Sequence, residues 1–157
     1  MHPTLLPLQL YGFDLSLNSY GALILLGVAC AVAWVVHGAP RHGVTRPAAL
    51  DLAFWLLVSG VLGARVLYLA VHGDRYLLAC LDPELYAAHF PPGQPPAPGD
   101  CWAALRLGSG GLVWYGGLFA AVAVGWLFAH RHRLSFVALA DLFVPAVALG
   151  HAIGRLG

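Results

Sequence analysis

The sequence contains no lysine and few charged residues of any kind. Its eight basic residues are all arginine, seven residues are acidic, and charged side chains make up 10% of the 157 residues, whereas 60% are hydrophobic. A soluble domain carries about 25% charged residues, so this chain has too few to cover a water-facing surface. The formal net charge of +1 also excludes nucleic-acid binding driven by a large basic field. The composition therefore predicts an integral membrane protein.

Cysteine and metal-binding patterns are scarce. Cys30 falls in an apolar segment, where a thiol serves as a small packing residue. The tract 130–133 (HRHR) is explained better by membrane topology than by metal binding, and no histidine pair has the carboxylate or thiolate support of a metal site. We therefore expect neither a metal nor a cofactor. The N-terminus lacks the pattern of a cleaved signal peptide, so the first apolar segment is expected to remain in the mature protein.

Four apolar segments of 17 to 20 residues follow one another along the chain. At 1.5 Å per residue they are about 26–30 Å long, which matches the hydrocarbon core of a bilayer. They cover residues 20–36, 52–71, 112–129 and 136–153. We predict an all-α, polytopic membrane protein with about four transmembrane helices, in which residues 1–157 form a single membrane domain.

The arginine distribution predicts the orientation of these helices. Loops 37–51 and 130–135 hold four arginines, whereas the longer loop 72–111 holds two arginines beside four acidic residues. Basic residues in short loops mark the cytoplasmic side. The N-terminus and loop 72–111 are therefore predicted to lie outside, and the fourth helix delivers Arg155 to the outer side.

Loop 72–111 is predicted to be an extracytoplasmic (periplasmic) loop and arm with a proline-rich insertion. Residues 75–89 favour a short helix, and residues 91–99 (PPGQPPAPG) interrupt it. Cys80 and Cys101 flank this interruption, in a compartment that is expected to be oxidising. They either form a disulfide or remain two unpaired thiols.

Two arginines and two tyrosines are predicted to reach the outer headgroup level. Tyr20 and Tyr115 begin the first and third helices, and Arg155 ends the fourth. Arg65 lies six residues before the end of the second segment, about 9 Å down the helix. Buried arginine is costly in a membrane, and a guanidinium matches phosphate geometry bidentately. The pattern therefore indicates a site for an anionic group.

Each of these residues also has a structural interpretation. Tyr20 and Tyr115 fit ordinary aromatic anchors of the membrane interface, and Arg155 fits a side chain that snorkels from a helix end. Arg65 could instead pair with an acidic or carbonyl group of the protein. His151 is more often a hydrogen-bonded core histidine than a base, and Asp141 is expected to cap or pair at the opposite end of its helix.

At these residues the sequence resembles the bacterial phosphatidylglycerol–prolipoprotein diacylglyceryl transferase family. The matching pieces keep the order and spacing of the family along the whole chain. They are residues 20–21 (YG), 63–68 (GARVLY), 110–118 (GGLVWYGGL), 141–145 (DLFVP) and 154–157 (GRLG).

The resemblance implies transfer of a diacylglyceryl group from phosphatidylglycerol to the lipobox cysteine of prolipoproteins, in the bacterial cytoplasmic (inner) membrane. The partners would be phosphatidylglycerol, prolipoprotein signal peptides and membrane lipid. Arg155 and Arg65 would bind the phosphate, Tyr20 would hydrogen-bond the headgroup, and Tyr115 would handle a proton or position the substrate. Gly117 and Gly154 would belong to the substrate-binding site.

Two departures from the family accompany the resemblance. The family continues past the GRLG step into further helices, so this chain is expected to be the N-terminal half, or slightly more, of a seven-helix protein. Some members also carry a histidine, proposed as the base, at the position of Tyr115, and a tyrosine is a poorer base at neutral pH. The alternative function is a non-catalytic lipid-binding or assembly module. A small transporter is the weakest hypothesis, because no inverted helix repeats support it.

The predicted orientation can be tested by labelling. A cysteine introduced at Gln94 should react with a membrane-impermeant maleimide in intact cells, because the arginine distribution puts loop 72–111 outside. A cysteine introduced at Arg131 is the matched control and should react after permeabilisation. The opposite labelling pattern would reverse the orientation.

Overall fold

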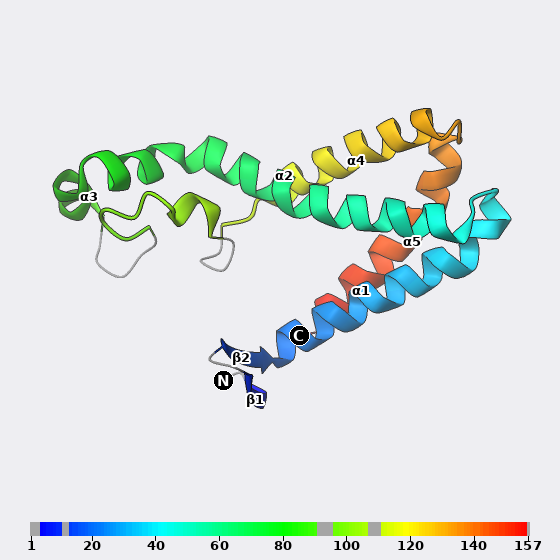
Figure 1. Cartoon of the computed structure of the whole chain (residues 1–157), viewed down its shortest axis with the longest axis horizontal. Helices are drawn as coiled ribbons and strands as arrows, with labels where there is room; N and C mark the ends of the chain where they lie inside the picture. Colours follow the sequence, from blue (N-terminus) through cyan, green and yellow to red (C-terminus); the bar gives the residue numbers. More distant parts are fainter. Residues whose placement is uncertain (1–3, 11–12, 91–95, 107–110, 157) are drawn as a thin grey trace. The chain divides into compact units, whose positions relative to one another are not determined.

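The computed structural model describes the backbone of residues 4–10, 13–90, 96–106 and 111–156, with side chains described from residue 21 onward. Its described part contains five α-helices and two short 3-10 turns (Figure 1), so the predicted all-α membrane class is confirmed. In chain order the elements are β1 Thr4–Leu10, β2 Phe13–Asn18, α1 Ser19–Gly38, η1 Ala39–His42, α2 Arg46–Leu81, α3 Pro83–His89, η2 Ala103–Leu105, α4 Trp114–Arg131 and α5 Phe136–Gly154.

Three helical stretches of the described chain are long and apolar enough to cross a membrane. They are Gly21–His42, Arg46–Leu81 and Phe136–Gly154, which correspond to three of the four predicted segments. The remaining segment, 112–129, forms α4, which is not among the three. Its 18 residues begin with Trp114 and Tyr115 and end with His130 and Arg131, which lower the average hydropathy of so short a helix.

The sequence analysis missed a two-stranded antiparallel sheet at the N-terminus. Strands β1 and β2 pair with Leu8 opposite Leu15 and Leu10 opposite Phe13. The sequence of β2, FDLSLN, alternates apolar and polar residues with a period of two, which is the pattern of a half-buried strand. The segment is short and directly precedes the apolar helix α1, whose signal is much stronger, so no strand was predicted there.

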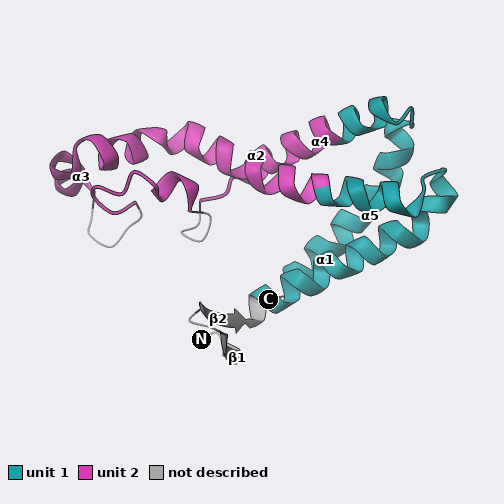
Figure 2. Cartoon of the chain, in the orientation of Figure 1, with its two compact units in different colours: residues 1–54, 125–157 teal, residues 55–124 magenta. Residues whose placement is uncertain are grey.

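The chain divides into two compact units, residues 1–54 with 125–157 and residues 55–124 (Figure 2). In the first unit, helices α1 and α5 lie side by side (Figure 1). They approach closely where Gly27 meets Gly150, since a Cβ on Gly27 would lie 2.7 Å from the carbonyl oxygen of Gly150. Small residues allow this kind of backbone contact between membrane helices. Val35 and Leu142 are buried in the same unit.

The second unit holds the predicted arm. Helix α2 has non-helical backbone angles at His72 (φ −119°, ψ 18°), directly after the predicted end of the second apolar segment at Val71. Beyond this kink the helix runs on to Leu81, and α3 follows with Asp82 as its N-cap, whose carboxylate accepts a hydrogen bond from Leu85 N at 3.0 Å. The predicted helix over 75–89 is thus two helices that meet at the cap.

Cys80 and Cys101 form a disulfide in this unit, with their sulfur atoms 1.93 Å apart. The bond joins the last turn of α2 to the segment that returns after the proline-rich residues, and Gly99 N donates to Ala79 O at 2.7 Å beside it. In Figure 1 this yellow-green return segment runs alongside the green part of α2. Of the two alternatives for the cysteine pair, the structure contains the disulfide.

The α1–α5 contact predicts a large difference between two glycines of the same helix. Gly27→Ala would push the backbones apart, at a cost of about 1–3 kcal/mol for overpacking. Gly21→Ala is the matched control, because a Cβ there meets no atom within 4 Å. Both changes gain the same helix propensity, so thermal unfolding in detergent should show a lower Tm for Gly27→Ala than for Gly21→Ala. Equal melting temperatures would contradict the contact.

Candidate functional site

Arg65 is a buried arginine in the middle of a candidate membrane span, with 5% of its surface exposed. Among the described residues, its guanidinium donates to the backbone carbonyls of Ala103, Ala104, Arg106 and Gly111. Nε reaches Ala104 O at 3.0 Å, and Nη2 reaches Ala103 O at 2.9 Å and Arg106 O at 3.1 Å. Nη1 reaches Gly111 O at 3.1 Å. The rigid fork of arginine suits such a set of acceptors, so Arg65 fastens residues 103–106 and Gly111 to α2.

Two tyrosine rings also lie near this charge. The Cζ atom of Arg65 lies 5.5 Å from the ring centroids of both Tyr68 and Tyr76. The two rings meet edge to face at 6.2 Å. Cations are attracted to aromatic faces at this range. Tyr68 lies one turn after Arg65 on the same helix face, whereas Tyr76 follows the kink at His72.

The structure therefore contains the carbonyl partners that were the alternative interpretation of Arg65. Each hydrogen bond to a charged donor contributes about 1.5–3 kcal/mol, and together they compensate for burying the guanidinium. Nothing in the structure tests the predicted contact between Arg65 and a lipid phosphate, which stays a prediction.

The carbonyls of Ala103, Ala104, Arg106 and Gly111 that accept from Arg65 are called the Arg65 cage below. Position 111 of this cage requires glycine for a steric reason. Its φ of +80° lies in the left-handed region, which favours glycine. A Cβ at this position would overlap the ring of Tyr68 and would lie 2.9 Å from Arg65 Nη1. Both the backbone conformation and the space around it therefore require glycine here.

The start of α4 is packed against α2 through the glycines of the 110–118 motif. Val113 N donates to Ala64 O at 3.1 Å. Gly116 contacts Gly63 directly, and a Cβ on Gly117 would lie 2.8 Å from Gly60 O. Gly117, predicted to bind substrate, thus has a packing role in the structure, and its substrate contact is untested.

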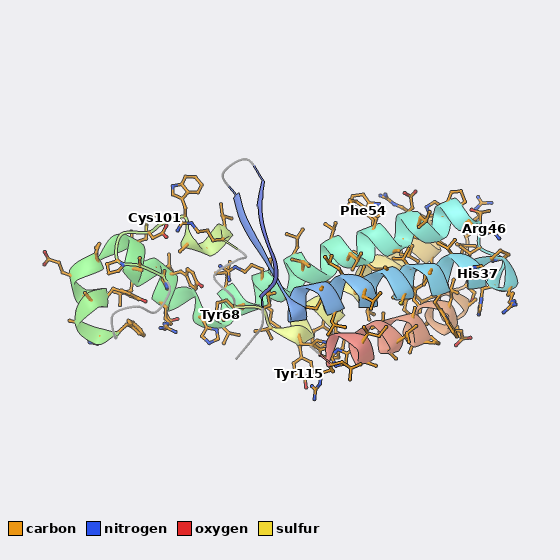
Figure 3. All side chains as sticks on the ribbon, turned by 90° about the horizontal axis from the view of Figure 1, so that it is seen from below. His37, Arg46, Phe54, Tyr68, Cys101 and Tyr115 are labelled. Carbon is orange, nitrogen blue, oxygen red and sulfur yellow. A yellow bond between two sulfur atoms is a disulfide. The ribbon has the colours of Figure 1, made fainter. Side chains whose placement is uncertain are left out.

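Tyr115 lies beside these packed glycines but is itself exposed. Its side chain is 62% exposed and meets Trp114 edge to face at 5.4 Å. Figure 3 labels Tyr115 on its helix, and it also labels Tyr68 and Cys101. All three residues belong to the same unit. Tyr115 follows Gly111 by four residues in the sequence. Because Arg65 holds the carbonyl of Gly111, the Arg65 cage positions the backbone just before Tyr115.

The other predicted site residues belong to the first unit. Arg155 is exposed and caps the C-terminus of α5, where its N–H donates to His151 O at 3.0 Å. His151 is itself exposed rather than a core histidine. A Cβ on Gly154 would make an ordinary contact with Ile24 at 3.9 Å. Tyr20 is the second residue of α1, and its side chain lies outside the described residues.

The four predicted ring residues are therefore divided between the units. Arg65 and Tyr115 lie in residues 55–124, and Tyr20 and Arg155 lie in the other unit. Their convergence at one headgroup-level site stays a prediction. Asp141, expected to cap or pair, is exposed in the second turn of α5, whose N-cap is Ser135.

The histidines of the 130–133 tract stack on aromatic rings one turn earlier. His130 lies on Trp126 with ring centroids 5.7 Å apart, and His132 lies on Phe128 at 4.1 Å. Among the described residues, no group of three or more histidine, cysteine or acidic side chains could hold a metal ion. These contacts give the two histidines a packing role.

Sequence reasoning missed three parts of the Arg65 site. The acceptor carbonyls carry no side-chain signal, so nothing in the sequence pointed to residues 103–106. Tyr76 lies eleven residues after Arg65, which is three helical turns, and this spacing could have placed it on the same face. Gly111 stood inside a recognised motif, but the sequence did not show which of its glycines needed a left-handed backbone.

The apolar spans and the arm fastened to α2 define a multi-pass membrane protein. The family model of prolipoprotein diacylglyceryl transferase matches residues 7–157 of this sequence, and the chain belongs to that family. The resemblance expected from the motifs is therefore confirmed.

Curated relatives extend well beyond the matched region. The phosphatidylglycerol–prolipoprotein diacylglyceryl transferase of Finegoldia magna is 30% identical over 145 residues, covering 92% of this chain and 50% of the relative. The enzymes of the same name from Mycobacterium leprae and Chromohalobacter salexigens are 34% and 31% identical, with 38% and 51% of their lengths covered. The chain thus spans about half the length, or less, of these relatives.

Two glycines with the same backbone conformation test the Arg65 cage. Gly99 has φ +81°, as left-handed as Gly111, but a Cβ on Gly99 would meet no atom within 4 Å. An alanine at either position pays about 1–2 kcal/mol for the left-handed backbone, and Gly111→Ala must also displace Tyr68 or Arg65. We expect faster amide hydrogen exchange at residues 103–106 in Gly111→Ala than in Gly99→Ala. Identical exchange in the two variants would contradict the cage.

Proposed function

We propose that this chain is part of a prolipoprotein diacylglyceryl transferase that binds phosphatidylglycerol in the bacterial cytoplasmic membrane. The family match over residues 7–157 carries this proposal, because it includes every predicted site residue from Tyr20 to Arg155. The names of the relatives supply the substrates, a phosphatidylglycerol donor and a prolipoprotein acceptor.

The reaction is a displacement at a glyceryl carbon. The sulfur of the prolipoprotein cysteine attacks the carbon that carries the phosphate, so a C–S bond forms and the C–O bond to phosphate breaks. The electron pair leaves with the phosphate oxygen as glycerol phosphate, and the thiol proton passes to solvent. Since the nucleophile belongs to the acceptor, the enzyme needs to orient two substrates and stabilise the negative charge that develops on the leaving group.

Arg155 is the residue we assign to that charge. Its side chain is exposed at the end of α5, and a guanidinium can hold a phosphate through two parallel hydrogen bonds. Tyr115, exposed at the start of α4, is assigned to proton handling or substrate positioning. Tyr20 is assigned to the headgroup. These roles are proposals from the resemblance, supported by the accessibility of Arg155 and Tyr115.

Arg65 has two proposed roles, of which the observed contacts favour one. A direct phosphate contact would require the guanidinium to exchange carbonyl partners that it already holds. We propose instead that Arg65 is a positioning residue, which fixes the backbone of residues 103–106 and Gly111 and, through Gly111, the approach to Tyr115.

A non-catalytic lipid-binding module is the second candidate, because membership of the family does not by itself require transfer. Both candidates require phosphatidylglycerol to be bound, and one of them also requires transfer. Lipid retention and lipidation must therefore be measured separately.

Arg155→Lys tests the proposed headgroup site, because lysine keeps the charge but loses the bidentate fork. The detergent-solubilised chain should retain phosphatidylglycerol over phosphatidylcholine in native mass spectrometry. Arg155→Lys and Arg155→Ala should lose this preference by about ten-fold, the effect of 1.4 kcal/mol. Arg46→Lys, at the start of α2, is the control and should retain it. An unchanged preference in Arg155→Ala would contradict the site.

Lipidation decides between the two candidates. The full-length protein that contains this chain is expressed in a bacterium depleted of its own transferase, and modification of a prolipoprotein is followed by gel mobility. Lipidation that requires Arg155 supports the enzyme. Retention of phosphatidylglycerol without any lipidation supports the lipid-binding module.

A further inference from the structure

Most exposed large apolar side chains of the described residues lie on the long helices α1, α2, α4 and α5, where lipid or another helix can cover them. Trp102 and Leu105 do not. Trp102 is the N-cap of the 3-10 turn η2 and Leu105 is its last residue, and they are 71% and 70% exposed. An exposed tryptophan beside an exposed leucine, outside the spanning helices themselves, is a surface that water solvates poorly.

The two side chains share one face of the turn. Leu105 N donates to Trp102 O at 3.0 Å, which is the hydrogen bond of a 3-10 turn, and residues three apart eclipse each other in that geometry. Ala103, between them in sequence, is 3% exposed and directs its carbonyl to Arg65. The turn therefore has an inner face that is fastened to α2 and an outer apolar face, which we call the 102/105 face.

The turn is held at both ends, so it cannot fold this face away. Cys101 precedes it and is bonded to Cys80. The carbonyls of Ala103, Ala104 and Arg106 are held by Arg65. A loop free to rearrange would bury a tryptophan and a leucine against the protein, because burial of apolar surface is favourable.

The attachment points show which environment surrounds this face. Arg65 lies seven residues before the kink at His72, and Cys80 lies eight residues after it. The segment that carries the turn thus straddles the place where the apolar part of α2 ends, which is the depth of a membrane–water interface. Tryptophan is enriched at that depth, because its ring is apolar and its indole N–H needs a polar partner.

The charges near the 102/105 face indicate what kind of lipid surface it fits. Asp100 and Arg106 flank the turn and pair with each other, with Arg106 Nη1 2.9 Å from Asp100 Oδ2. The pair leaves the turn without a local excess of either sign, so attraction to an anionic headgroup is not needed. Apolar insertion at the level of the glycerol backbone is sufficient.

We propose that the 102/105 face is a membrane-interface anchor, which inserts Trp102 and Leu105 among the lipids around the end of the apolar part of α2 and fixes the depth of the arm. The occupant is the bilayer surface itself. This inference is independent of phosphatidylglycerol transfer, because a non-catalytic membrane module would use the same anchor.

Depth-dependent fluorescence quenching tests the anchor. The full chain is placed in phosphatidylcholine nanodiscs, with Trp102 as the sole tryptophan after Trp34→Phe, Trp55→Phe, Trp114→Phe and Trp126→Phe. Lipids brominated near the glycerol end of the acyl chains should quench most of the Trp102 emission, and lipids brominated at the chain ends should quench it less. A variant that keeps Trp55 alone, on candidate span α2, serves as the positive control for access to bromine.

Every other outcome overturns the proposal. Water-like emission without quenching would place Trp102 in solvent, and blue-shifted emission without quenching would place it under protein. Stronger quenching by chain-end bromine would bury it in the hydrocarbon core. Retention of the Cys80–Cys101 crosslink reports folding of the variant. If folding is lost, Trp102→Phe in the otherwise unchanged chain should remove the shallow-quenched part of the emission.

Discussion

The hydrogen bonds between the Arg65 guanidinium and the carbonyls of residues 103, 104, 106 and 111 are the constraint on which the second unit depends. They satisfy a charge that would be costly inside a membrane segment, and they give an irregular backbone its partners. Irregular backbone at such a depth is tolerated when it is buried against protein. The same bonds fix the entry to α4, since Gly111 and Val113 both contact α2 beside Arg65. Removing the arginine would leave several carbonyls without a donor at once.

Glycine makes the close helix contacts in both units possible. Gly27 meets Gly150 in one unit, and Gly63 meets Gly116 in the other. These glycines give backbone contact where lipid tails would compete equally well with larger apolar side chains. Helix packing therefore brings the backbones close enough for the Arg65 contacts to form. Tyr115 is exposed because α4 packs against α2 through its glycines and not through this side chain.

Much of the helical framework could be predicted from the sequence, because apolar length is a strong local signal. The segment 136–153 matches α5 within one residue, and the end predicted at Val71 matches the kink at His72. The N-terminal hairpin was missed because a short alternating strand is a weak signal. The partners of Arg65 could not be predicted either, since backbone carbonyls have no sequence signature and their approach depends on how the chain returns after the proline-rich residues. Whether Arg155 and Arg65 share a site depends likewise on tertiary packing.

The partners of Arg65 are supplied by residues that follow it by 38 to 46 positions in the chain. During synthesis at about 5–20 residues per second, roughly 2–8 s therefore pass between the addition of Arg65 and the addition of Ala103. Over that interval the arginine has to be accommodated by the insertion machinery, by water or by lipid headgroups. The guanidinium thus disfavours membrane insertion of α2 until residues made later supply its hydrogen-bond acceptors. Folding of the arm and final placement of α2 in the bilayer are therefore expected to be coupled.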